Sequence, residues 1–213
     1  MRVSERGAAL FAVLMVTSLV SALAAALVFV TVTESRIGRT YQSAQAVGYA
    51  ATAGIERTIA DLRALPDWAA ISASQSATGD FNDGNLAPVL ADRAALDLTR
   101  LTAARQATSN SFYPAGANRP VWTLYAHASL AHITSFDLSA NPYVVVWIAD
   151  DPGETDGDPA RDSNGIVLVR AEAFGVRGSW RVVEATLAGS ILRDTDGIAI
   201  GSTVAVAAWR EAR

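Results

Sequence analysis

Hydrophobic and polar residues divide the start of the chain into two stretches of different pattern. From Gly7 through Thr33 no residue is charged and most positions are apolar. About 20 apolar residues, each adding about 1.5 Å of helix, are enough to cross the roughly 30 Å hydrocarbon layer of a membrane. The first stretch therefore predicts a membrane-spanning helix over residues 8–33.

The charges around this stretch predict its orientation. Arg2 and Arg6 precede it and Glu34 follows it, so the bias of positive charge toward the cytoplasm places the N-terminus inside and the rest of the chain outside. A cleaved secretory signal is the alternative, because residues 22–24 (Ala-Leu-Ala) form a usable cleavage site. The apolar run continues past that site to Val32, which favours a helix that stays attached.

The second stretch, residues 34–65, has the pattern of an amphipathic helix. Apolar and small residues recur at steps of three and four while the other positions are polar or charged, and Pro66 ends the pattern. We expect one continuous helix whose second half packs on a folded domain, with Gly48 and Gly54 as close-packing positions. The expected buried stripe consists of Ile37, Tyr41, Ala44, Gly48, Ala51, Ile55, Ile59 and Leu62.

The second half of the chain has the composition of β-strands. Five segments rich in valine, isoleucine and aromatic residues are separated by clusters of Gly, Pro, Asn and Asp, at residues 121–127, 143–149, 166–174, 180–188 and 203–209. We expect an antiparallel sheet packed on the amphipathic helix. Residues 85–106 predict one or two short helices between the long helix and the sheet.

The segments 166–174 and 180–188 predict a hairpin around "GVRG" at residues 175–178. If Phe174 pairs with Ser179, Glu172 lies opposite Arg181 as a cross-strand charge pair.

Composition excludes several classes of function. The 17 basic residues are spread along the chain and the net charge is −4, which argues against nucleic acid as a partner. The chain has no cysteine, so disulfide and zinc-thiolate chemistry are not available to it. An apolar share of 51% is high for a soluble protein and agrees with a membrane segment.

Polar chemistry is concentrated in the acidic loop, which we define as residues 150–165, "DDPGETDGDPARDSNG". Its carboxylate and amide oxygens are sufficient for the six to eight ligands of a calcium ion. The spacing is not that of an EF-hand, because Ala160 stands where a third oxygen ligand is expected. A solvated turn between two strands is the simpler interpretation, and the candidate calcium ligands are Asp150, Asp151, Glu154, Asp156, Asp158, Asp162 and Asn164.

Catalytic motifs are lacking in the sequence. His127 and His132 lie in or near a predicted strand, without a spaced carboxylate or serine that would complete a triad. The chain has no phosphate-binding glycine loop, nucleophile elbow or metalloprotease motif. We expect a protein that is not an enzyme and has no cofactor other than the candidate calcium.

The order of these features resembles the type IV pilins and the type II secretion pseudopilins, and the PilX-type minor pilins in particular. A short charged leader ending in glycine precedes an uncut apolar helix and its amphipathic continuation. The stretches that carry the resemblance are "ERGAALFAVLM" (5–15), "ESRIGRTY" (34–41), "YAATAGIERTIADL" (49–62), "PVWTLYAHASLAH" (120–132), "NPYVVVWIADDP" (141–152) and "DGDPARDSNG" (156–165).

The resemblance implies how the N-terminus is processed. Proteins of this kind are cut by a prepilin peptidase after the leader glycine, here Gly7, and the new first residue, here Ala8, is N-methylated. Most major pilins carry glutamate as the fifth mature residue, whereas this chain has Ala12. The resemblance also implies an inner-membrane precursor that later joins a filament through helix contacts with other pilin or pseudopilin subunits.

The resulting expectation is an α+β, pilin-like fold. It comprises a leader (1–7), the transmembrane half (8–33) and amphipathic half (34–65) of one helix, and a periplasmic or extracellular domain (66–213) with a C-terminal antiparallel sheet. The expected function is that of a minor pilin in type IV pilus assembly, at the tip or in priming. A minor pseudopilin of a type II secretion system is the first alternative, and a secreted or membrane-anchored periplasmic binding or enzymatic domain is the second.

Overall fold

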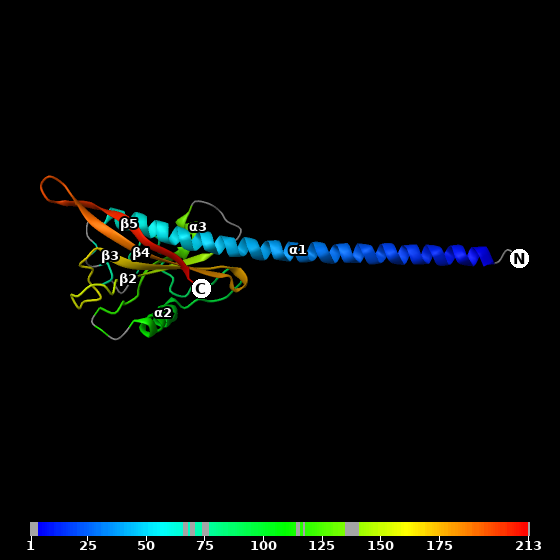
Figure 1. Cartoon of the computed structure of the whole chain (residues 1–213), viewed down its shortest axis with the longest axis horizontal. Coiled ribbons are helices and arrows are strands. Elements are labelled where there is room, and N and C mark those ends of the chain that lie inside the picture. Colours follow the sequence, from blue (N-terminus) through cyan, green and yellow to red (C-terminus); the bar gives the residue numbers. More distant parts are fainter. Residues whose placement is uncertain are drawn as a thin grey trace. The chain divides into compact units, whose positions relative to one another are not determined.

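The computed structural model describes residues 4–65, 68, 71–73, 77–113, 116, 118–134 and 141–212. The chain forms two compact units, Met1–Gln42 and Ser43–Arg213. The helices are α1 (Ser4–Ala64), α2 (Leu98–Phe112) and α3 (Leu130–Ile133) (Figure 1). The strands are β1 (Thr123–Ser129), β2 (Tyr143–Asp150), β3 (Ile166–Phe174), β4 (Trp180–Arg193) and β5 (Ala199–Ala212). The expected continuous helix and antiparallel sheet are confirmed, and Pro66 lies outside the described residues.

The first unit contains the apolar half of α1. Every side chain from Gly7 to Gln42 is exposed, and α1 is long and apolar enough to cross a membrane by length and composition. Its threonine hydroxyls are satisfied within the helix, since Thr17 donates to the carbonyl of Val13 and Thr31 donates to that of Leu27, both at 2.9 Å. This half therefore offers an apolar side-chain surface and keeps those hydroxyls paired.

The second half of α1, within the second unit, packs on the sheet. Four residues of the expected stripe are buried, namely Ala51, Ile55, Ile59 and Leu62. Val47, Ala50 and Thr58 are also buried. Ile37 and Tyr41 were expected in the same stripe but are 64% and 65% exposed. The buried stripe therefore begins at Val47 rather than at Ile37.

The two glycines of this half differ in their surroundings. A Cβ added at Gly54 would lie 2.8 Å from Cγ1 of Val144 and 3.3 Å from Cγ2 of Val146, both on β2. A Cβ added at Gly48 would meet nothing within 4 Å. The close-packing expectation is therefore confirmed for Gly54 and is wrong for Gly48.

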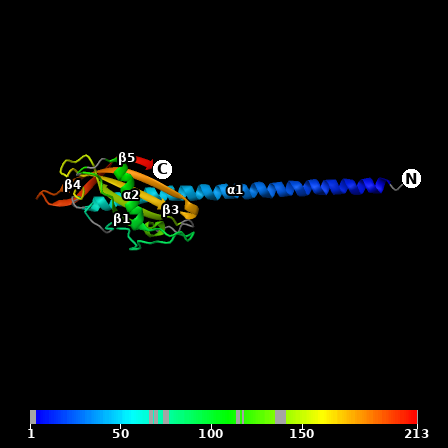
Figure 2. The same cartoon turned by 90° about the horizontal axis from the view of Figure 1, so that it is seen from below.

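The five strands form one antiparallel sheet in the order β1-β2-β3-β4-β5, so each strand pairs with its neighbour in sequence. All eight residues of β2 are buried. Val144, Val146 and Ile148 belong to the core shared with α1, whereas Val145 and Trp147 pack with Leu98 on the other face. Because both faces are covered, β2 is a continuous apolar run and does not alternate. Figures 1 and 2 show α2 on the face of the sheet opposite the second half of α1.

A single helix occupies part of the region where one or two short helices were expected. Asp97 is the N-cap of α2 and its carboxylate accepts the backbone N–H of Arg100 at 2.9 Å. Before this cap, side chains of Asn85 and Asp92 accept backbone N–H groups two residues later. These local hydrogen bonds favour turns over helix in residues 85–97.

The expected hairpin register is wrong by one residue. Phe174 pairs with Trp180, so Arg181 lies opposite Ala173 and Val182 lies opposite Glu172. The connection contains five residues, 175–179, with Arg177 at φ 58° and Gly178 at φ 69°. A shift of one residue turns a side chain to the other face of the sheet, so Arg181 and Glu172 point to opposite faces.

Glu172 instead joins α2 to the outer face of the sheet. Its carboxylate is fully buried and accepts hydrogen bonds from Arg105 of α2 at 2.7 Å and from Arg170 at 2.6 Å. The indole N–H of Trp180 donates to the same carboxylate at 3.0 Å. A buried carboxylate held by two guanidinium groups is stable only while these partners remain.

Substitution of the two α1 glycines by alanine tests the packing of this helix on β2. Gly54→Ala should lower the free energy of unfolding by about 1–3 kcal/mol, because the new methyl group overlaps Val144 in a filled core. Gly48→Ala is the matched control and should leave stability unchanged or raise it by up to about 1 kcal/mol, because alanine is the better helix former. Thermal or denaturant unfolding of both variants measures the difference. Equal stabilities would show that Gly54 is not a close-packing position.

Candidate functional site

The acidic loop connects β2 to β3, and three of its carboxylates converge. Asp150 is the last residue of β2 and is 2% exposed, while Glu154 is 8% exposed. One oxygen from each of Asp150, Asp151 and Glu154 lies within 4.8 Å of the others. The three oxygens are close enough to bind a single cation such as calcium, and the protein would then supply part of the coordination shell.

Glu154 and Asp162 shape the loop through their own hydrogen bonds. Glu154 accepts the backbone N–H groups of Ser163 and Asn164 at 2.9 and 2.8 Å and the hydroxyl of Ser163 at 2.6 Å. Asp162 accepts the backbone N–H of Gly165 at 2.7 Å. These contacts pin residues 162–165 at the start of β3, as a turn rich in Asp, Asn and Gly requires.

The other three candidate ligands also bond within the loop. Asn164 donates to Asp151 at 2.8 Å and accepts the backbone N–H of Ile166 at 2.7 Å. Asp156 and Asp158 are exposed, and each accepts a backbone N–H two residues later at 3.1 Å. The structure therefore brings three of the seven candidate ligands together and places the rest in turn-forming contacts.

The ionised carboxylates of this cluster repel one another. Burial, and next the charge of Glu154, raise the pKa of Asp150 to about 7. Burial also raises the pKa of Asp162. For Glu154 burial acts to raise the pKa, but the hydrogen bonds from Ser163 and Asn164 outweigh it and leave the pKa lowered. A proton or a cation near Asp150 relieves this repulsion.

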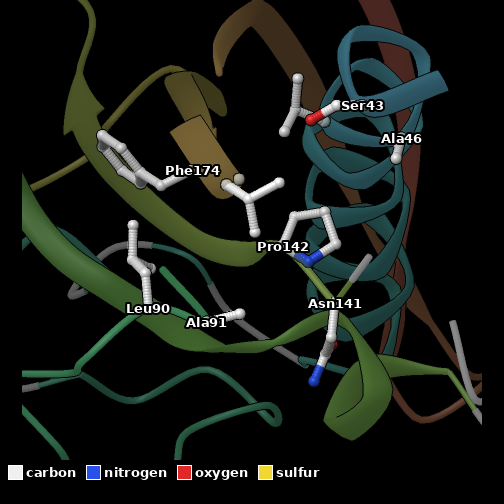
Figure 3. Close-up of a pocket in the computed structure, with 10 residues that line it drawn as sticks. Ser43, Ala46, Leu90, Ala91, Asn141, Pro142 and Phe174 are labelled. Carbon is white, nitrogen blue, oxygen red and sulfur yellow. The ribbon is translucent and has the colours of Figure 1, made fainter. Parts of the chain in front are cut away.

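Two of the cavities that the described residues form lie in the second unit. The larger has a volume of about 290 Å³ and adjoins the acidic loop, with Trp68, Arg161, Asp162, Gly189 and Ser202 in its lining. Figure 3 shows the smaller, of about 10 Å³, lined in part by Ser43 and Ala46 of α1 and by Pro142 and Phe174. The smaller cavity has room for about one water molecule and no larger ligand.

The positions expected to be processed lie in the first unit. Gly7, Ala8 and Ala12 are exposed residues of α1. A Cβ added at Gly7 would meet nothing within 4 Å. Substitution of Gly7 therefore carries no steric penalty in the folded chain.

A polar cluster that the sequence did not predict surrounds His127. Its Nδ1 lies 2.9 Å from the hydroxyl oxygen of Tyr143, and that hydroxyl donates to Asp83 at 2.9 Å. The single hydroxyl proton is used by Asp83, so His127 is the donor to Tyr143. Burial lowers the pKa of His127, and Asp83 acts in the opposite direction. Since His127 is 1% exposed, it ties the segment around Asp83 to the sheet and does not face solvent, whereas His132 is exposed.

Asp83 lies far from His127 in the sequence, in a loop of Asp, Asn and Gly that indicates only a turn. No periodic or spacing signal could have paired the two residues.

No protein-family model, curated protein or solved structure matches this chain.

Calcium binding at the acidic loop stays a prediction. The raised pKa of Asp150 predicts how this binding depends on pH. Between about pH 4 and pH 7 the folded chain holds a proton on Asp150 that the unfolded chain has lost, so the free energy of unfolding falls as pH rises through this range. Calcium must displace that proton. We therefore expect calcium to raise the melting temperature at pH 8 and to have less effect at pH 5.5.

Each 1 kcal/mol of stabilisation should appear as about 2–4 °C in the melting temperature for a chain of this length. Asp150→Asn should remove both the calcium increment and the loss of stability toward pH 7. The double variant Asp156→Asn, Asp158→Asn is the control, because these exposed side chains lie outside the converging group. Equal melting temperatures in calcium and in chelator at pH 8 would leave the solvated turn as the interpretation of the loop.

Proposed function

We propose that this chain is a minor pilin that takes part in type IV pilus assembly. The observation that carries the proposal is α1, a single 61-residue helix with two chemically different halves. The first half is uncharged from Gly7 to Thr33 and exposed. The second half is buried against an antiparallel sheet from Val47 onward.

The two halves suit two successive surroundings. An exposed, uncharged helix is stable in a bilayer, and equally among other apolar helices in the centre of a filament. The sheet, α2 and the acidic loop form a domain whose core does not require the first half. In this proposal the precursor lies in the inner membrane with its N-terminus in the cytoplasm, and the same helix later joins other pilin or pseudopilin subunits.

The charged leader explains how one helix serves both stages. Arg2, Glu5 and Arg6 precede Gly7, and a prepilin peptidase that cuts after Gly7 removes all three charges. The mature chain then begins at Ala8 with an apolar first turn, and its methylated amine is the remaining charge at that end.

Ala12 suggests a position within the filament. A glutamate at the fifth mature position pairs with the N-terminal amine of a neighbouring subunit, because an unpaired charge in an apolar environment is costly. This chain has Ala12 there and cannot form that pair. Its own amine can still be neutralised by another subunit's glutamate, so the tip, where no earlier amine needs a partner, is the position that costs least.

The mature N-terminus tests the proposal. The full chain should be expressed with a prepilin peptidase, and the N-terminal peptide should be identified by mass spectrometry. We expect it to begin at Ala8 and to carry one methyl group. A peptide beginning near Ala25 would indicate a secreted domain, and retention of Met1 would indicate a plain membrane anchor; either result would overturn the proposal.

A pair of glycine variants separates recognition by the peptidase from helix stability. Gly7→Val should abolish cleavage, and Gly38→Val should leave cleavage intact. Both glycines are exposed positions of α1 where an added Cβ meets nothing within 4 Å, so both substitutions have similar effects on the helix itself. Equal processing of the two variants would show that the leader glycine is not recognised.

A further inference from the structure

The two edges of the sheet differ in how they are covered. β1 forms one edge, and residues 79–83 run along it, with the N–H of His127 donating to Phe81 at 3.1 Å and the N–H of Gly79 donating to Tyr125 at 2.7 Å. β5 forms the other edge. Within the described part of the chain, no segment pairs with the outer side of β5. The unpaired backbone groups of β5 are therefore a template for a further strand.

β5 also lacks the side chains that usually protect an edge. Exposed edges are commonly short, or carry lysine, proline or inward-pointing charges. β5 has 14 residues, and no residue from Ile198 through Trp209 is charged or is proline. Ile200, Val206 and Trp209 are 66%, 48% and 40% exposed. In Figure 1 the β4–β5 hairpin, orange to red, extends beyond the other strands.

Two register irregularities limit where a further strand can pair. They fall between Thr186 and Leu187 and between Leu192 and Arg193 of β4. Between them, Gly201–Val206 of β5 pairs in regular register with Leu187–Leu192. Gly201 has φ 154°, and Gly201 and Ser202 are buried. Thr203–Val206 is therefore the part of the edge whose regular register is suited to continued pairing.

We propose that the β5 edge is an interface with a second copy of this chain, formed by antiparallel pairing of β5 with β5. The partner must be an extended strand, because unpaired backbone donors and acceptors are what the edge offers. In a second copy residues 79–83 already pair with the β1 edge, whereas none of the described residues pairs with the outer side of β5. Two uncharged edges approach without like-charge repulsion.

A β5–β5 contact joins only two chains, and it places apolar side chains of the two copies against each other. Both copies use the same edge about a two-fold axis, so the contact joins two chains and stops. Residues directly opposite in an antiparallel pair lie on the same face of the sheet, which brings each apolar row against the other. On the face that carries Leu187 and Ala185 this row includes Val206 and Trp209, their partners across the β4–β5 pair. Pairs of aromatic and β-branched side chains stabilise such contacts.

The lack of native cysteine makes a cross-linking test direct. Single cysteines should be placed in the full chain, in detergent, at Thr203, Val204, Ala205 and Val206, and oxidised. In a two-fold antiparallel pair the residue on the axis faces itself, so we expect one of these positions to give the strongest disulfide dimer and its neighbours to give less. Thr123→Cys on β1, at the opposite edge of the sheet, is the control and should stay monomeric. No dimer at any β5 position, or an equal yield from Thr123→Cys, would overturn the proposal.

A charge placed on the edge tests the interface without oxidation. Val206→Lys should weaken dimerisation at least about tenfold, a change of about 1.4 kcal/mol in binding free energy, as measured by light scattering across a concentration series in detergent. Val121→Lys is the matched control, because Val121 is 42% exposed and Val206 is 48% exposed, and it should leave dimerisation unchanged. Cooperative thermal unfolding of both variants confirms that they are folded.

A chain that is monomeric throughout the series, or two variants that behave alike, would contradict β5 pairing. The outcome is independent of the mature N-terminus, so the interface and the pilin proposal can fail separately.

Discussion

The contact between the second half of α1 and β2 is the interaction on which the rest of the domain depends. Gly54 lets the helix backbone approach Val144 and Val146 so closely that no side chain fits between them. This contact assigns one face of the sheet to α1, so the other face of β2, with Val145 and Trp147, must be covered by something else. α2 provides the cover, and the indole N–H of Trp147 donates to Thr102 at 2.7 Å. The apolar run of β2 up to Ala149 is stable only because both of its faces are covered.

Outside the acidic loop, the buried Glu172 has cationic partners on the outer face of the sheet. On the outer face, Arg170 connects Glu172 to Glu184, and Arg210 of β5 also donates to Glu184 at 2.6 Å. In the acidic loop, Asp150 is buried beside other carboxylates and lacks a cationic partner among the ion pairs of the described residues. Burial, and next the charge of Glu154, therefore raise the pKa of Asp150. The loop is therefore the part of the domain where a cation or a proton changes stability most directly.

The sequence predicted those features that depend on local patterns. The uncharged run from Gly7, the helical stripe from Ala51 to Leu62 and the β-rich segments each carry a periodicity or composition specific to one element. The bounds of β3 agree with the expected segment, whereas β4 and β5 extend further because they stay paired as far as Arg193 and Ala199.

Features that depend on contacts between distant residues could not be predicted. The register of β3 and β4 is set by the positive φ values of Arg177 and Gly178, and an arginine in that conformation has no sequence signal. The partners of Glu172 come from α2 and two strands. The link between Asp83 and His127 joins a loop to β1. For the acidic loop, composition identified the stretch, but only the geometry separates the converging Asp150, Asp151 and Glu154 from the exposed Asp156 and Asp158.

The central claim is that one helix carries two halves that require different surroundings, and solubility tests this claim most directly. The full chain and a chain that begins at Glu34 should be compared by membrane fractionation and by thermal unfolding without detergent. The account predicts that the full chain stays with the membrane until detergent is added, while the shorter chain is soluble and unfolds cooperatively, because the core around Ile55 and β2 is intact. A full chain that is soluble by itself, or a shorter chain that aggregates unfolded, would contradict the account.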